Sequence, residues 1–279
     1  EKAVIYLSRN LPKNYEIFIA GDQLEEEIDN IKYIHSNNLQ KLLNENNFHT
    51  IIVSRYVSFF EEYINYKCYQ LLLSSHDTYF LGNNKIIKKH IKYIDNVICL
   101  TEWHKNEFIG KYNYLKDKIR VINNGINISD FNNENINLNK KIKNKFVWSS
   151  RPERGLNILL ELWPKILEKI PDATLDISSY DNFTEETMYI KNIIDKYDSI
   201  TYHGKLNTEQ LYKLISTADY WLYTCTWPET SCITAMEMLM SNVICLYYPV
   251  AGLVNTVGDY GIKVENGTEL DIILKNHHL

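Results

Sequence analysis

Two arginines and a glycine lie between a short apolar run and a long amphipathic stretch in the second half of the sequence. They are Arg151, Arg154 and Gly155, in the segment SSRPERGL. The amphipathic stretch is expected to be a helix, and a helix N-terminus attracts anions through its free N–H groups and its dipole. Guanidinium groups at that place make a clamp for a diphosphate. The alternative is an ordinary surface turn in which Arg154 pairs with Glu153 or Glu161.

Two glutamates bracket the predicted start of another helix. Glu229 lies just ahead of Thr230 and Ser231, which are good N-cap residues, so the helix dipole favours its charge. Glu237 follows inside the helix among alanine, methionine and leucine. A buried carboxylate is costly unless it is hydrogen-bonded, and a ribose or a sugar offers two hydroxyl donors to one carboxylate. The alternative places Glu237 on an exposed helix face, paired with a distant lysine.

Two histidines follow predicted strands. His76 precedes Asp77 after an apolar run in the first half, where an imidazole could donate to a sugar hydroxyl or a phosphate oxygen. The alternative is a turn in which Asp77 caps the next segment. His203 and Gly204 follow a strand of the second half, and Gly204 would let the backbone approach a flat ligand such as a base. The alternative there is a simple turn.

Several familiar motifs are absent from the sequence. Without G-x-G-x-x-G or G-x-x-x-x-G-K-[ST], a dinucleotide dehydrogenase and a P-loop ATPase are unsupported. Without G-x-S-x-G, an α/β-hydrolase is unsupported. No D-x-D pair and no histidine or cysteine cluster with zinc spacing occurs. We therefore expect no metal and no cofactor.

The composition is that of a folded globular protein. Its 279 residues are 45% hydrophobic and 23% charged, and this length suits two domains. The net charge of −5 does not favour a phosphate-backbone ligand, so we expect no nucleic-acid partner. No run of about 18 apolar residues occurs, so no segment is expected to span a membrane. Five scattered cysteines without a C-x-x-C pair indicate reduced, buried thiols and a cytoplasmic protein.

Short apolar runs alternate with amphipathic stretches along the chain, which is typical of parallel sheets with crossover helices. We expect an α/β protein of two Rossmann-like, doubly wound domains that face a cleft. The domains are residues 1–140 and 141–279, with the boundary in the polar run 132–145. Ligands of such sheets bind beyond the carboxyl ends of the strands, where the arginines, glutamates and histidines lie. Strands are predicted at 15–20, 50–54, 69–74, 96–100, 119–122, 146–149, 173–178, 199–202, 220–224, 243–246 and 261–264, and helices at 2–11, 85–93, 102–112, 155–170, 185–197, 209–217, 231–240 and 269–275.

Taken together, these segments resemble glycosyltransferase family 4, which are retaining enzymes of the GT-B fold. The family's signature is a pair of glutamates with seven residues between them, here Glu229 and Glu237. The arginine segment upstream, the His-Gly pair between, VINNGI at 121–126 and TEW at 101–103 are also similar to family segments. The resemblance covers most of the chain and is best from about residue 95 to residue 255.

The resemblance implies a metal-independent hexosyltransferase that moves a sugar from a nucleoside diphosphate sugar to an acceptor hydroxyl and retains the anomeric configuration. By this resemblance Glu237 holds the ribose hydroxyls, and Glu229 holds hydroxyls of the transferred sugar. Arg154 falls where the family has its diphosphate-binding residue, usually a lysine, and Arg151 lies near the family's other basic residue at a shorter spacing. The remaining implied positions are the backbone N–H groups of Thr230, Ser231 and Cys232 on the diphosphate, His76 on the donor sugar, and Gly204 near the base.

The sequence departs from the family at its ends. The family's first strand and glycine-rich loop are expected ahead of the helix at 2–11, and its last, crossing helix is expected after residue 279. Two alternatives therefore stay open: a non-catalytic module that binds sugar nucleotides or glycans, and a related GT-B epimerase or phosphorylase. The acceptor, whether glycan, protein or lipid, is not specified. The lysine- and isoleucine-rich stretch 85–91 is either an ordinary amphipathic surface helix or a peripheral membrane contact.

Overall fold

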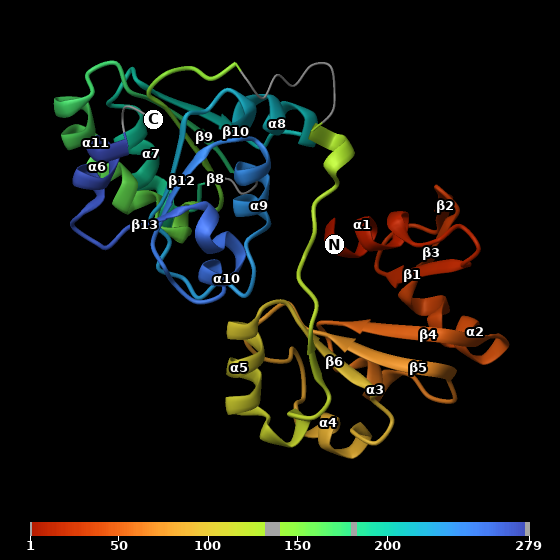
Figure 1. Cartoon of the computed structure of the whole chain (residues 1–279). Helices are drawn as coiled ribbons and strands as arrows, with labels where there is room; N and C mark the ends of the chain where they lie inside the picture. Colours follow the sequence, from red (N-terminus) through yellow and green to blue (C-terminus); the bar gives the residue numbers. More distant parts are fainter. Residues whose placement is uncertain (1, 132–139, 180–182, 277–279) are drawn as a thin grey trace. The chain divides into compact units, whose positions relative to one another are not determined.

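The computed structural model describes residues 2–131, 140–179 and 183–276. The chain forms two compact units, Glu1–Gly125 and Ile126–Leu279 (Figure 1). The predicted boundary at residues 140 and 141 lies further along the chain. Phe131 is 2% exposed and belongs to the core of the second unit, with Ile126 packed against that core. The chain therefore joins the second unit before the polar run at 132–145, of which residues 132–139 lie outside the described part.

A six-stranded parallel sheet forms the centre of the second unit, in the order β10-β9-β8-β11-β12-β13. From β8, successive strands of the chain are added on one side as β9 and β10 and on the other side as β11, β12 and β13. The direction of strand addition therefore reverses between β8 and β11. Ligands of open α/β sheets bind at such a reversal, beyond the carboxyl ends of the strands. The strands are β8 (Lys145–Ser149), β9 (Thr174–Ser178), β10 (Ile200–Gly204), β11 (Tyr220–Tyr223), β12 (Ile244–Tyr247) and β13 (Ile262–Lys263).

Helices cover both faces of this sheet (Figure 1). The predicted helices of the second half are all present, with their ends moved by a few residues. One more helix, α10, was not predicted because five residues are too few to show an amphipathic period. The helices are α6 (Leu156–Lys169), α7 (Met188–Ile194), α8 (Thr208–Ser216), α9 (Ile233–Met240), α10 (Leu253–Val257) and α11 (Glu269–Asn276).

Two sheets are present among the described residues of the first unit. The larger has four parallel strands in sequence order, β4-β5-β6-β7, and the smaller has the order β1-β3-β2 with β2 antiparallel to β3. Sequence periodicity missed β2, which is exposed throughout, as well as β3, α2 and the short α3. The elements are α1 (Lys2–Asn10), β1 (Ile17–Gly21), β2 (Glu26–Ile28), β3 (Ile31–His35), α2 (Ser36–Glu45), β4 (Asn47–Ser54), α3 (Phe59–Glu62), β5 (Lys67–Ser74), α4 (Lys85–His90), β6 (Asn96–Cys99), α5 (Glu102–Lys111) and β7 (Ile119–Val121).

The predicted fold class is confirmed, because each unit is built on a parallel sheet with helices. A reversal of strand order occurs only in the second unit, as far as the described strands show. All five cysteines are free thiols, and only Cys68 is not fully buried. In the described ranges, none of the helices has the length and apolar character needed to cross a bilayer.

Backbone packing joins the ends of β8 and β11. Gly155, which follows the short 3-10 turn Pro152–Arg154, has a φ of 109°. A Cβ atom on Gly155 would lie 2.2 Å from the carbonyl oxygen of Thr224, and the Thr224 hydroxyl donates to the carbonyl of Gly155 at 2.7 Å. Only glycine fits here, because any side chain would meet backbone that cannot move away. The loop after β8 is thus seated on the end of β11.

Gly155→Ala should therefore destabilise the chain by more than the cost of a left-handed alanine. We expect a loss of about 3 kcal/mol or more, because strain and a backbone clash add. The matched control is Gly267→Ala, since Gly267 has a φ of 91° but no atom within 4 Å of its virtual Cβ. The control should lose only about 1 kcal/mol. Urea unfolding of both variants measures this, and equal losses would contradict the close approach.

Candidate active site

The loops that follow β8 and β11 meet at the reversal of strand order and bring Arg154 and Glu229 together. Nη1 of Arg154 lies 3.4 Å from Oε1 of Glu229, and the two side chains are 22% and 18% exposed. The Arg154 guanidinium also stacks on the ring of Trp227, 4.7 Å from its centroid. Two residues that the sequence assigned separately are therefore partners in one half-buried ion pair.

This pairing replaces the local alternative for Arg154. Glu153 lies 3.9 Å from Arg151 instead, and both of those side chains are about half exposed. Nη1 of Arg154 is buried and donates no hydrogen bond within the described ranges, despite its ion pair. A buried guanidinium nitrogen without a hydrogen bond is costly. The ion pair with Glu229 offsets part of this cost.

Burial sets the charge balance of the pair. It raises the pKa of the Glu229 carboxyl, while Arg154 and a hydrogen bond from Tyr223 act in the opposite direction. The Tyr223 hydroxyl donates to Oε1 of Glu229 at 3.1 Å. Glu229 thus has one cation and one neutral donor on the same oxygen, which compensates in part for its desolvation.

Glu237 is buried within α9, with 3% of its surface exposed. The Tyr212 hydroxyl of α8 donates to its Oε1 at 3.0 Å. The alternative that placed Glu237 on an exposed helix face is therefore wrong. A carboxylate at this depth needs hydrogen-bond donors, and Tyr212 supplies one that sequence periodicity did not reveal.

The start of α9 differs from the prediction. The helix begins at Ile233, with Cys232 in an extended N-cap conformation. The backbone N–H of Cys232 donates to the Thr256 hydroxyl at 3.3 Å. The Ser231 hydroxyl is buried and takes no hydrogen bond from any residue that the structure describes, and Thr230 is 9% exposed. The sequence predicted that the backbone N–H groups of Thr230, Ser231 and Cys232 bind an anion. The N–H of Cys232 already donates within the protein.

The loop after β12 supports the Glu229 segment. The Gly252 N–H donates to the carbonyl of Glu229 at 2.8 Å, and a Cβ on Gly252 would lie 2.4 Å from the carbonyl oxygen of Thr230. Ala251, just before it, has a φ of 54°. Strained backbone of this kind is typical of functional loops. Gly252 lies six residues after the end of the predicted strand 243–246, so its place relative to that strand did not mark it as a site residue.

His76 belongs to the first unit and follows β5. Its Nε2 lies 3.5 Å from the Ser74 hydroxyl, and burial and the nearby Arg55 lower its pKa. Asp77 does not cap the next segment, because its carboxylate accepts two hydrogen bonds from Arg55 at 2.9 and 2.7 Å. Nε2 of the buried His104 lies 2.8 Å from the Asp77 carbonyl. The sequence predicted neither Arg55 nor His104.

His203 and Gly204 have structural roles in the second unit. His203 interacts with the Asp176 carboxylate of β9. Gly204 has a φ of 65°, and its carbonyl accepts from the backbone N–H of Ser179 and from the Ser178 hydroxyl. These contacts favour the turn interpretation, while a role of Gly204 near a base stays a prediction.

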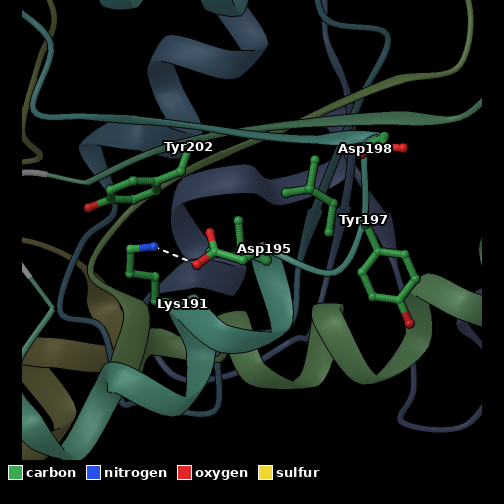
Figure 2. A pocket seen from close by; sticks show the side chains of 7 residues that line it. Lys191, Asp195, Tyr197, Asp198 and Tyr202 are labelled. Carbon is green, nitrogen blue, oxygen red and sulfur yellow. Dashed lines mark hydrogen bonds and ion pairs between the residues drawn. The ribbon is translucent and has the colours of Figure 1, made fainter.

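Figure 2 shows an open hollow of about 540 Å³ in the second unit. Lys191 and Asp195 form an ion pair along its wall, at 2.5 Å. Tyr197 and Asp198 line it too, just before β10 begins, so the hollow lies at the amino end of that strand. None of the predicted site residues lines it. We therefore place the candidate site at the carboxyl ends of β8 and β11.

Two family models match the sequence. Residues 5–130 match Glycosyltransferase Family 4, and residues 129–270 match Glycosyl transferases group 1. The second match spans more than half of the chain. The chain belongs to the glycosyl transferases group 1 family. This confirms the family resemblance of the sequence, and the protein is a glycosyltransferase of the GT-B type.

Solved structures agree with this fold. A glycosyltransferase from Rickettsia africae has a TM-score of 0.72 and 18% identity, over 90% of this chain and 75% of that one. The pneumococcal O-GlcNAc transferase GtfA, in complex with UDP and GlcNAc, has 0.60 and 18%, over 86% and 51%. Starch synthase IV from Arabidopsis thaliana, bound to ADP and acarbose, has 0.62 and 11%, over 83% and 62%. The chain thus spans half to three quarters of these proteins. No curated protein matches the sequence.

The ion pair of this glycosyltransferase makes its stability depend on pH in a defined way. Arg154→Met keeps an apolar side chain against Trp227 but removes the charge. The pKa of Glu229 should then rise further. Above that pKa the variant is destabilised by a buried, ionised carboxylate without a cation, and below it the protonated carboxyl causes no such loss of stability. We expect the variant to lose about 1–2 kcal/mol at about pH 8 and clearly less at about pH 5.

Thermal unfolding at both pH values measures this difference. Arg151→Met is the matched control, because Arg151 and its partner Glu153 are exposed and such pairs contribute little. Its loss should be small and the same at both pH values. A loss for Arg154→Met that does not change with pH would contradict the pairing with Glu229.

Proposed function

We propose that this glycosyltransferase transfers a sugar from a nucleoside diphosphate sugar to an acceptor hydroxyl, with retention of the anomeric configuration and without a metal or cofactor. The observation that carries the proposal is the Arg154–Glu229 pair at the reversal of strand order, with the buried Glu237 on the helix that follows. A cation for a diphosphate and one carboxylate for sugar hydroxyls then lie on adjacent loops, and a second carboxylate lies on α9. The pneumococcal relative in complex with UDP and GlcNAc supports a ligand of this class.

Each residue has one part in this proposal. Glu237 accepts from the ribose hydroxyls, and Glu229 accepts from hydroxyls of the transferred sugar. Arg154 binds the diphosphate, with Arg151 at the rim. His76 contributes from the first unit to the donor sugar. The further contacts are the backbone N–H groups of Thr230 and Ser231 on the diphosphate and the backbone of Gly204 near the base; the N–H of Cys232 is left out because it donates to the Thr256 hydroxyl.

The proposed chemistry needs no nucleophile from the protein. The bond between the anomeric carbon and the diphosphate oxygen breaks, and the acceptor oxygen forms its bond on the same face. The departing diphosphate takes the proton of the incoming hydroxyl. Arg154 and the N-terminus of α9 stabilise the charge that develops on the leaving group, and preorganised donors of this kind are worth roughly 2.7–4 kcal/mol each in other enzymes.

A thermal-shift panel with UDP, GDP, ADP and their common sugars, with and without EDTA, tests the proposal. A ligand at about 100 times its Kd stabilises by about 2.7 kcal/mol, which moves Tm by several degrees. We expect a shift with one nucleotide family that EDTA does not change. Turnover of that donor with an acceptor distinguishes the transferase from a binding module, and conversion of donor without acceptor would indicate an epimerase. No shift with any nucleotide would contradict the donor site.

Glu237→Gln should weaken binding of the nucleotide found in that panel by about tenfold, because a charged acceptor becomes a neutral amide. Glu269→Gln is the matched control. Glu269 is also buried, at 2% exposure, and also accepts from a tyrosine hydroxyl, that of Tyr248. Calorimetric titration of the control should give the native affinity. Native affinity for Glu237→Gln would reject the ribose assignment.

A further inference from the structure

Tyr223 is the last residue of β11, and its ring is buried in the core of the second unit. Its exposed fraction is 1%. The ring stacks on Trp221 at 4.5 Å and contacts Trp148 at 5.2 Å between centroids. The only polar atom of the side chain is the hydroxyl, and it reaches Glu229 in the next loop at 3.1 Å. The core thus fixes the hydroxyl that holds a site carboxylate.

The direction of the hydrogen bonds follows from the carboxylate. An ionised carboxylate only accepts hydrogen bonds, so the Tyr223 hydroxyl must be the donor in its hydrogen bond to Oε1 of Glu229. The Ser150 hydroxyl, 3.3 Å from the Tyr223 oxygen, must then donate to that oxygen. Ser150 follows β8 and Glu229 follows β11, so this chain of hydrogen bonds joins the two loops of the site.

Both contacts of Glu229 fall on the same oxygen. Oε1 accepts from Tyr223 and pairs with Arg154. Oε2 accepts no hydrogen bond from any residue in the described ranges. It is also absent from the buried atoms that have no partner, so Oε2 is accessible from outside the protein. With one oxygen held from two sides, the carboxylate cannot rotate freely, and the other oxygen keeps one direction.

We propose that Tyr223 is a positioning residue for Glu229: its hydroxyl fixes Oε1 so that Oε2 is presented to a hydroxyl of the donor sugar. This inference rests on the proposed function, in which Glu229 binds the sugar and not the nucleotide. The effect of Tyr223 is then confined to ligands that carry the sugar. A hydrogen bond to a charged group that is already formed before the ligand arrives removes the cost of orienting the carboxylate at binding.

The test compares Tyr223→Phe with Tyr220→Phe. Tyr220 lies on the same strand, is 2% exposed, and also gives one hydrogen bond, to the carbonyl of Asn276. Both variants lose one buried hydroxyl, but only Tyr223 contacts Glu229. We expect Tyr223→Phe to weaken binding of the nucleoside diphosphate sugar by about tenfold and to leave binding of the sugar-free nucleoside diphosphate within about twofold. Tyr220→Phe should leave both within about twofold, and Ser150→Ala should resemble Tyr223→Phe with a smaller effect.

A double-mutant cycle with Glu229→Gln shows whether Tyr223 acts through Glu229. If it does, adding Tyr223→Phe to Glu229→Gln changes sugar-nucleotide affinity by less than about twofold. Independent, additive losses would overturn the inference, as would equal losses with and without the sugar. Failure of the native chain to bind any sugar nucleotide would reject the proposed function and this inference with it, whereas native binding by Tyr223→Phe would reject this inference alone.

Discussion

Contact between the backbones at Gly155 and Thr224 is the constraint on which the rest of the site depends. It seats the loop after β8 on the end of β11, at the place where the order of the parallel sheet reverses. With the two loops held at this separation, Arg154 meets Glu229 and the Ser150 hydroxyl meets Tyr223. The contacts between side chains at the site therefore depend on a close approach of two backbones, which is possible only because residue 155 is a glycine.

The second unit supplies both the rigidity and the charge of the site. Its core contains large rings that are fully buried, Trp148, Trp221 and Tyr223 among them, and Trp148 and Tyr223 lie at the ends of the strands that carry the loops. A tightly packed ring is already ordered by its neighbours, so little further entropy is lost when its hydroxyl forms a hydrogen bond. The loop after β12 adds a backbone hydrogen bond to Glu229. Three successive strand ends thus converge on one carboxylate.

The fold of the second unit could largely be predicted, because β8, β11 and β12 contain continuous apolar runs and the helices α6 and α8 are amphipathic. Arg154 and Glu229 could be predicted as site residues because they follow strands, but their mutual pairing could not. Local spacing pointed to Glu153 and Glu161 as partners of Arg154, whereas the observed partner lies in another loop. Tyr223 was hidden for a related reason, since a buried tyrosine at the end of an apolar strand has no sequence feature that shows where its hydroxyl points. In the first unit, the exposed strand β2 gave no apolar pattern to detect.

Three glutamates of the second unit share one kind of partner. Glu229, Glu237 and Glu269 each accept a hydrogen bond from a tyrosine hydroxyl. Dissolved ions screen exposed charge pairs within a Debye length of about 8 Å at physiological ionic strength, but they have little effect on a buried bond from a neutral donor. Two of these glutamates are almost fully buried. Because each of these acids accepts from a phenol, including Glu229, which also pairs with Arg154, the fold keeps them in position when the salt concentration of its surroundings changes.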